Sequence, residues 1–221
     1  NSSDFPRAAA SDPISLPSLN FRHADPSALP ENMYQLSRNA RIPVMHPAVR
    51  PGEIVIDATA GNGHDTRFLA ELVGVDGLVY SLDLQSEAIS RTRRLLDERG
   101  LKNVILSHRD HAELQMAIPD MQCGRVAAVM FNLGYLPGGD KGFVTRADST
   151  QRAIDAALEL LRPAGVLTVL AYAGHPGGLD EANRVAKHLA HLSAERFTVS
   201  EPAAAKTHHA AAPRLFVVSK R

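Results

Sequence analysis

The chain has 221 residues with 24 basic and 24 acidic side chains, so its formal net charge of zero excludes a global field that attracts nucleic acid. Its hydrophobic content of 44% is ordinary for a globular protein, and its only cysteine, Cys123, excludes a disulfide framework or zinc knuckle and fits a reducing compartment. No apolar run reaches the roughly 18 residues of a membrane span.

Residues 1–30 are rich in Ser, Pro and Ala and show no sustained period, which predicts an irregular extension. Residues 31–221 are expected to form a single domain. Within it, residues 31–48 are expected to hold a short helix and then an extended piece across Pro43 and Pro47, placed to cover a pocket.

The ends of this domain are locally basic. Residues 38–50 contain three arginines and His46 without an acid, and residues 196–221 contain five Lys or Arg residues against Glu201 alone. These segments are interpreted as patches for a polyanion or, alternatively, as solvated chain ends. With no signal peptide visible, we expect a cytoplasmic protein, or an organellar one if a transit peptide precedes Asn1.

From residue 53 onward, strand-like and helix-like segments alternate. Apolar runs predict strands at 53–58, 78–82, 103–107, 126–131, 166–172, 196–201 and 214–219. Helical periodicity predicts helices at 64–73, 86–99, 112–117, 148–162 and 179–191. The pattern predicts an α/β fold with a seven-stranded, mostly parallel sheet, helices on both faces and one antiparallel strand near the C-terminus. This predicted strand order resembles the Rossmann-like sheet of class I methyltransferases.

The turn after the first strand is predicted to form the entrance of a cofactor site. Gly61 and Gly63 allow a sharp turn and a close approach of the backbone to a ligand, and the following helix N-terminus favours a carboxylate or phosphate. A dinucleotide fingerprint requires Gly or Ala where Thr66 stands. Asp57 is instead placed for the ammonium of an amino-acid-bearing cofactor such as S-adenosylmethionine.

Polar residues also end the next three strands. Because carboxyl ends of parallel strands meet at one edge, Asp83, Asp110 and Asn132 are expected to lie together there with Asp57. Asp83 suits the two hydroxyls of an adenosine ribose, although a helix N-cap is the alternative role. Asp110 and His111 are predicted to border the adenine, with a plain polar loop as the alternative.

A loop of about sixteen residues follows Asn132, long enough to indicate a functional loop. Asn132, Gly134 and Tyr135 resemble the acceptor motif of amino-directed methyltransferases. There a neutral amine attacks the methyl of a sulfonium; Asn132 would orient its N–H bonds and Tyr135 would pack on the base. Most of the rate would come from proximity and orientation, and a general base is optional.

Histidines offer further candidates. His64, His111 and His175 are candidate bases or binding residues, each with a structural role as the alternative. His208 and His209 lack a carboxylate or cysteine at ligand spacing, so we predict no metal.

Three motifs together resemble a bacterial and plastid family labelled rRNA methylases and associated with the tRNA 5-aminomethyl-2-thiouridine methyltransferase. The resemblance covers about residues 40–221. It is carried by Asp57-Ala-Thr-Ala-Gly-Asn-Gly-His-Asp-Thr66, Asn132-Leu-Gly-Tyr-Leu-Pro-Gly-Gly-Asp140, Tyr172-Ala-Gly-His-Pro-Gly-Gly178, Thr145 and Thr150. It implies a class I fold, S-adenosylmethionine as methyl donor, and N-methylation of an aminomethyl group on the wobble uridine in the anticodon of tRNA.

The resemblance also implies site residues. The cofactor contacts it implies are Asp57, Gly61, Asn62, Asp65, Thr66, Asp83 and Asp110; their neighbours Thr59, Gly63, Gln85 and His111 complete the predicted set. The predicted catalytic residues are Asn132, Tyr135 and Asp140, and the predicted substrate-binding residues are Leu133, Gly134, Lys141 and His175. One departure is the stretch 208–213, where relatives usually carry an Asn-Pro-type sequence.

Other functions compete with this one. The same chemistry could act on rRNA or on a small-molecule amine, and a phosphate-contacting surface would reveal itself by binding that weakens with salt. A non-catalytic nucleotide- or RNA-binding module is an alternative of another class, and a nicotinamide dehydrogenase is disfavoured by Thr66. The expected partner is the anticodon region of tRNA, with no membrane and no metal; a homodimer is left open.

Overall fold

A computed structural model describes residues 42–136, 138, 144–202 and 213–221. The predicted extension at 1–30, the candidate residues Asp140 and Lys141, and residues 208–212 of the stretch 208–213 therefore lie outside the described residues. The assignment of 31–221 to one domain stays a prediction.

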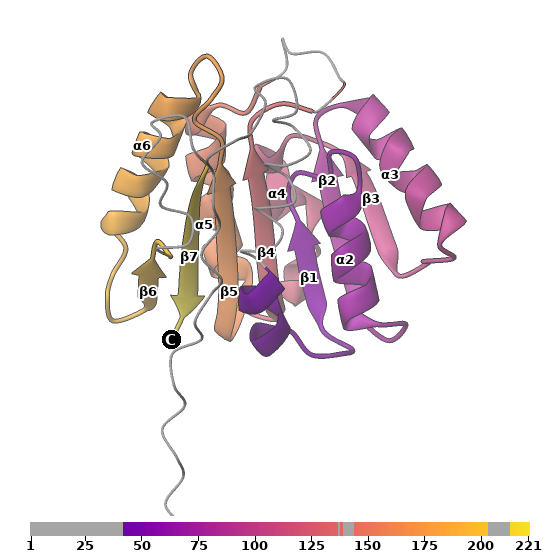
Figure 1. The fold of residues 1–221 in the computed structure, drawn as a ribbon. Helices are drawn as coiled ribbons and strands as arrows, with labels where there is room; N and C mark the ends of the chain where they lie inside the picture. Colours follow the sequence, from indigo (N-terminus) through magenta and orange to yellow (C-terminus); the bar gives the residue numbers. More distant parts are fainter. Residues whose placement is uncertain (1–41, 137, 139–143, 203–212) are drawn as a thin grey trace, which may run out of the picture.

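The described residues build one seven-stranded sheet with the order β3-β2-β1-β4-β5-β7-β6 (Figure 1). The strands are β1 (Ile54–Asp57), β2 (Leu78–Asp83), β3 (Val104–His108), β4 (Val126–Leu133), β5 (Leu161–Ala171), β6 (Phe197–Ser200) and β7 (Arg214–Lys220). The five neighbouring strands β3, β2, β1, β4 and β5 pair in parallel, whereas β7 runs antiparallel to both β5 and β6. The predicted fold class is confirmed.

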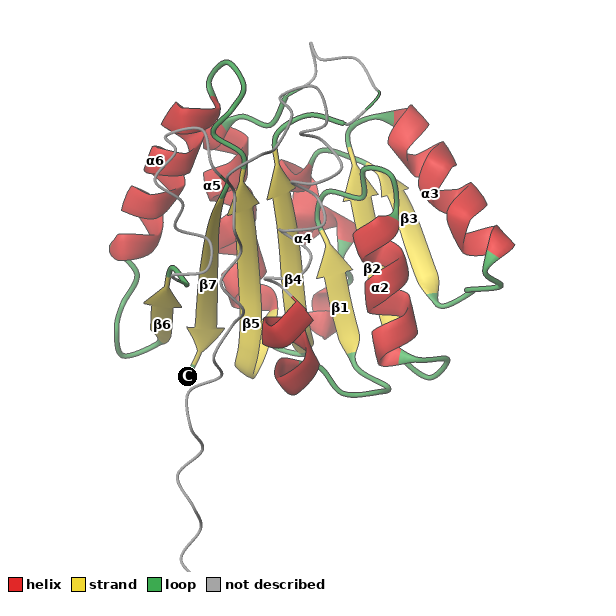
Figure 2. Ribbon diagram, viewed as in Figure 1, coloured by secondary structure: helices red, strands yellow, loops and turns green. Residues whose placement is uncertain are grey.

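Helices cover both faces of the sheet (Figure 2). They are α2 (His64–Val73), α3 (Ser86–Glu98), α4 (Leu114–Ala117), α5 (Ala147–Leu160) and α6 (Gly178–Ala190). Apolar residues of α4, α5 and α6 join one core cluster, and those of α2 and residues 45–49 join a second cluster on the other face. Because both faces are covered, the central strand β4 reads as an almost continuous apolar run.

Most element boundaries agree with expectation to within about two residues, but the start of β5 does not. β5 begins at Leu161, five residues before the predicted 166, because Leu161 already pairs with Val126. Pro163 cannot continue a helix, and Lys220 donates to the carbonyls of Leu158 and Leu161 at the end of α5. The chain therefore leaves the helix directly into the sheet.

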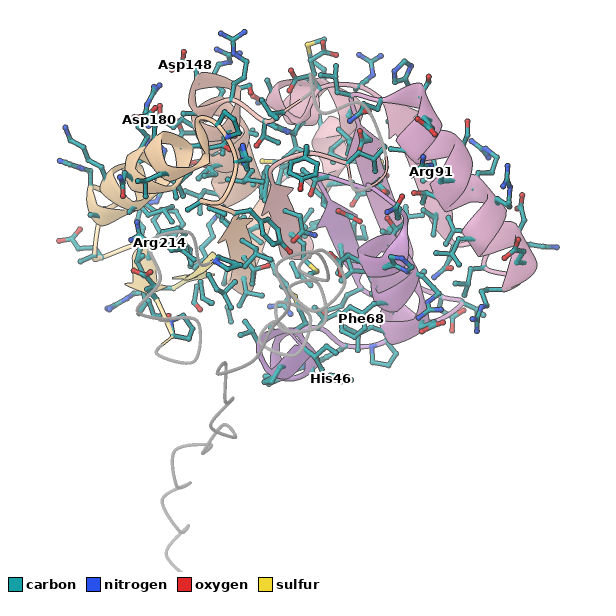
Figure 3. The ribbon with its side chains drawn as sticks, turned by 45° about the horizontal axis from the view of Figure 1, so that its top comes forward. His46, Phe68, Arg91, Asp148, Asp180 and Arg214 are labelled. Carbon is teal, nitrogen blue, oxygen red and sulfur yellow. The ribbon has the colours of Figure 1, made fainter. Side chains whose placement is uncertain are left out.

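The extended piece expected across Pro43 and Pro47 is wrong, since residues 42–48 are helical. Pro47 removes one backbone hydrogen bond, but Met45 and Val49 are buried at 0% and 3% exposure against the sheet, which compensates. His46 packs edge-on against Phe68 of α2, at the end of the sheet where β1 begins (Figure 3). This helix therefore lies away from the carboxyl ends of the strands and does not cover a pocket there.

Among the described residues, no helix is long and apolar enough to cross a membrane.

Candidate active site

A cavity of about 580 Å³ opens at the carboxyl ends of the parallel strands, where ligands bind in open α/β sheets. Its walls come from the turn after β1, the end of β2, the loop after β3, the end of β4 with the residues that follow, and the start of α5. The lining residues are Ala58, Thr59, Ala60, Gly61, Asn62, His64, Asp65, Arg67, Asp83, Leu84, Gln85, Asp110, His111, Asn132, Leu133, Gly134, Tyr135, Leu136, Val144, Thr145, Arg146, Ser149 and Tyr172.

The turn after β1 is held from below by a buried carboxylate. Asp57 is fully buried and accepts from the backbone N–H of Thr59 at 3.1 Å and from the hydroxyl of Thr66 at 2.6 Å. Thr66 also shares a hydrogen bond with Ser81 of β2. Asp57 and Thr66 thus lie beneath the turn rather than in the cavity lining, where they fix the position of the residues that do line it.

The two glycines of the turn serve different purposes. Both have positive φ, +54° at Gly61 and +81° at Gly63, a region that favours glycine. A Cβ on Gly63 would lie 2.9 Å from Cα of Thr92, so α3 packs directly on the turn there. A Cβ on Gly61 would meet nothing closer than 3.8 Å. Gly61 lines the cavity, whereas Gly63 is set by helix packing.

Asp83, at the end of β2, presents a carboxylate to the cavity. Its oxygens accept from the backbone N–H groups of Gly61 and Gln85, each at 2.9 Å. Burial raises the pKa of this carboxyl, and the two backbone hydrogen bonds partly counter that rise. A carboxylate has about four acceptor positions, so two N–H donors leave capacity for two ligand hydroxyls. This matches a ribose.

The loop after β3 adds a buried imidazole. His111 is 8% exposed, lies edge-on to Phe131, and its Nε2 has no hydrogen-bond partner within the described part of the chain. Burial lowers the pKa of His111, and the nearby carboxylate of Asp110 only partly opposes this shift. The ring is therefore neutral at pH 7 and leaves one buried ring nitrogen for a ligand such as a purine. Asp110 accepts from the backbone N–H of Ala112 at 2.8 Å.

Asn132 joins the acceptor side to the cofactor turn. Its backbone N–H donates to the hydroxyl of Thr59 at 2.7 Å, and its side-chain Nδ2 donates to the buried carboxylate of Asp65 on α2. The nitrogen of the amide is directed at Asp65, and its carbonyl oxygen is the end of the amide that can accept an N–H. Asp65 therefore sets the orientation of Asn132.

Residues after β4 form the outer wall. Tyr135 is 38% exposed, and its ring lies edge-on to His175, with ring centroids 6.0 Å apart. His175 lies outside the cavity lining, and its Nε2 is buried without a hydrogen-bond partner in the part of the chain described here. It supports the Tyr135 wall from behind. Leu133 and Gly134 line the cavity as predicted substrate-side residues.

Arg91 of α3 connects the two sides of the site. Its guanidinium donates to Oδ1 of Asn62 in the cofactor turn at 3.0 Å and to the carbonyl of Gly138 at 3.1 Å. In Figure 3 this arginine lies on α3, at the side of the molecule opposite α6.

The structure thus brings together most of the predicted set. Asp57, Gly63, Thr66 and His175 lie outside the lining, and the remaining described candidates line the cavity. Sequence reasoning missed Arg67, Leu84, Leu136, Arg146, Ser149 and the buried Glu181. A signal existed for Glu181, because it falls four residues before Val185 on the inward face of α6.

The residues fit S-adenosylmethionine. Asp83 has capacity for ribose hydroxyls, His111 offers an unpartnered buried nitrogen, and Gly61 leaves room beside the turn. No group of His, Cys, Asp or Glu that could hold a metal ion occurs among the residues that the structure describes.

Comparisons with known proteins agree with this geometry. The family described as "Putative rRNA methylase" matches residues 79–219. The chloroplastic tRNA (mnm(5)s(2)U34)-methyltransferase of Arabidopsis thaliana is 41% identical over 147 residues, which cover 62% of this chain and 53% of that protein. The chain thus spans about half the length of that relative.

Two solved structures extend the likeness to the whole fold. A protein from Clostridium thermocellum, described as a "putative rRNA-methylase", is 36% identical with a TM-score of 0.78, and the match covers 84% of this chain and 97% of that chain. A protein from Streptococcus mutans in complex with SAH, described as a "putative methyltransferase", is 30% identical with a TM-score of 0.71, and the match covers 85% of this chain and 97% of that chain. The chain belongs to this rRNA-methylase family of class I S-adenosylmethionine-dependent methyltransferases.

Proposed function

We propose that this protein methylates the aminomethyl nitrogen of a modified wobble uridine, 5-aminomethyl-2-thiouridine, in the anticodon region of tRNA. The observation that carries the proposal is the placement of Asn132, whose amide is oriented by Asp65 and whose backbone is tied to Thr59 of the cofactor turn. The name of the chloroplastic relative supports the choice of acceptor. The protein is proposed to work where tRNA is modified, in the cytoplasm or in an organelle.

On the acceptor side, Asn132 orients the amine and Tyr135 holds the base. The carbonyl oxygen of Asn132 accepts an N–H of the neutral amine and aims its lone pair, while the half-exposed ring of Tyr135 packs on the base. S-adenosylmethionine supplies an electrophilic methyl group. With the cofactor bound, the amine nitrogen would form the new N–C bond as the C–S bond breaks, and its extra proton would leave to water. Orientation supplies most of the rate.

The test is methyl transfer from S-adenosylmethionine to two tRNA pools, one carrying 5-aminomethyl-2-thiouridine and one lacking the aminomethyl group. Nucleosides are then analysed by mass spectrometry. We expect one added methyl on that nucleoside in the first pool only. Transfer to rRNA or to a small amine, with neither tRNA pool methylated, would replace the substrate. Cofactor binding without transfer to any amine would favour a binding module instead.

A further inference from the structure

A buried carboxylate far from the cofactor turn makes contacts that the proposed reaction does not use. Glu181 lies in the first turn of α6 and is 3% exposed. Both of its oxygens accept from threonine hydroxyls: Oε2 from Thr145 at 2.6 Å and Oε1 from Thr150 at 2.7 Å. An ionised carboxylate accepts such bonds strongly when water is excluded.

Of these two threonines, Thr145 also hydrogen-bonds to Gly134, which lines the acceptor side of the cavity. The hydroxyl of Thr145 also accepts from the backbone N–H of Gly134 at 2.9 Å, and the backbone N–H of Thr145 donates to the carbonyl of Gly134 at 2.9 Å. The adjacent residues Tyr135 and Val144 form an antiparallel bridge. We call the four residues 134, 135, 144 and 145 the acceptor clasp. It begins two residues after Asn132.

We infer that Glu181 is a positioning residue for the methyl acceptor, acting through Thr145 and the acceptor clasp; the inference about the acceptor rests on the proposed function. A hydroxyl has one hydrogen to donate and rotates freely unless an acceptor holds it in a hydrogen bond. Glu181 accepts this hydrogen bond, so the oxygen of Thr145 presents a lone pair to the N–H of Gly134. This contact fixes where Tyr135 stands relative to Asn132.

The chain offers a matched pair of variants. Thr145→Val and Thr150→Val each remove one hydroxyl that donates to the same carboxylate, but among the described hydrogen bonds the hydroxyl of Thr145, and not that of Thr150, also accepts from Gly134. Thr145→Ser keeps the hydroxyl and serves as the conservative rescue. Three quantities are measured: hydrogen exchange of the Gly134 amide by NMR, kcat and KM for the acceptor RNA, and Kd for S-adenosylmethionine.

In Thr145→Val we expect Gly134 to exchange at least about tenfold faster and kcat/KM for RNA to fall at least about tenfold, as for loss of a charge-assisted hydrogen-bond chain. The Kd for S-adenosylmethionine should stay within about twofold, because the hydrogen bonds of Thr145 run to Gly134 and Glu181 and not to the turn after β1. Thr150→Val should retain both exchange and kinetics, and Thr145→Ser should recover them.

A double variant tests whether Glu181 acts through Thr145. Once Thr145 is Val, adding Glu181→Leu should lower kcat/KM by no more than about twofold, because the path to Gly134 is already broken. Additive kinetic losses would contradict the inference.

Equal kinetic losses in Thr145→Val and Thr150→Val would also overturn it, as would unchanged exchange of Gly134. The exchange readout needs no substrate. If exchange changes as expected while no RNA accepts a methyl group, the proposed function fails and the contact itself stands.

Discussion

The two sides of the cavity are built in different ways. On the cofactor side, contacts join consecutive elements, such as the bond from Gly61 to Asp83 across 22 residues. On the acceptor side they span more sequence: Asn132 meets Asp65 across 67 residues, and Thr145 meets Glu181 across 36. The cofactor side is therefore built by elements that follow one another in the chain, from β1 to the loop after β3, whereas the acceptor side depends on the packing of α2, α5 and α6. Substitutions should separate donor binding from methyl transfer accordingly.

The largest effect on methyl transfer, with little effect on donor binding, is expected at Asn132. Asn132→Ala removes the acceptor for the substrate amine, so we expect kcat to fall roughly 10²-fold or more, in line with loss of a preorganised polar contact. The Kd for S-adenosylmethionine should change little, because Asp83 and the turn remain. Single-turnover methyl transfer and calorimetric titration measure the two quantities. An equal loss in cofactor affinity would show that the two sides are not separable.

On the cofactor side, the largest loss in the free energy of unfolding is expected at Gly63. In Gly63→Ala the new Cβ would meet the main chain of Thr92 at a positive φ, so we expect a loss of roughly 2–4 kcal/mol in the free energy of unfolding. Gly61→Ala has the positive φ without the clash and should lose about 1 kcal/mol. Urea unfolding measures both. Equal losses would mean that α3 shifts and does not constrain the turn.

Asp83 isolates the cofactor side. Asp83→Asn removes the charge that would accept the ribose hydroxyls, so we expect a roughly 10–100-fold weaker Kd for S-adenosylmethionine, with kcat at saturation within about threefold. Asp97→Asn, at an exposed position on α3, is the control. A fall in kcat at saturation comparable with the loss in Kd would argue that Asp83 also orders the acceptor wall.

The smallest expected effect is a pH dependence from His111. Its pKa in the folded chain lies below 6.5, so below that pH the unfolded chain binds more protons than the folded one. Stability from this group is complete above pH 6.5 and is lost as pH falls toward the lowered pKa. His111→Gln should flatten this slope, by at most about 1.4 kcal/mol per pH unit. Unfolding free energies measured across this range test it; identical slopes would assign the dependence to other histidines.

Periodicity in the sequence predicts the sheet well, because each strand is an apolar run bounded by turns and each major helix has one apolar face. It predicts the start of β5 and residues 42–48 poorly. Burial of Met45 outweighs the bond lost at Pro47, and the pairing of Leu161 with Val126 depends on a distant strand. Both are long-range effects that local patterns do not contain.

The candidate site shows the same limit. The strand-end rule brings Asp83, Asp110 and Asn132 to one cavity, as expected from parallel strands. It does not distinguish residues that face a ligand from those that support the turn, and it predicts a cofactor contact for Asp57, which lies beneath the turn. Glu181 lies on an apolar helix face, and only the fold shows that Thr145 and Thr150 accompany it there.

Arg91 contacts the cofactor turn at Asn62 and the carbonyl of Gly138, which falls between the two halves of the acceptor clasp in sequence, so one guanidinium links the two sides of the site. If bound S-adenosylmethionine shifts these hydrogen bonds and so changes the affinity for RNA by some factor, bound RNA must change the affinity for S-adenosylmethionine by the same factor, because linkage is reciprocal. Titrations of S-adenosylmethionine with and without RNA, and of RNA with and without S-adenosylmethionine, would yield that factor twice. Arg91→Leu should bring this coupling factor to about one, which would make the coupling between donor and acceptor binding a property of one side chain.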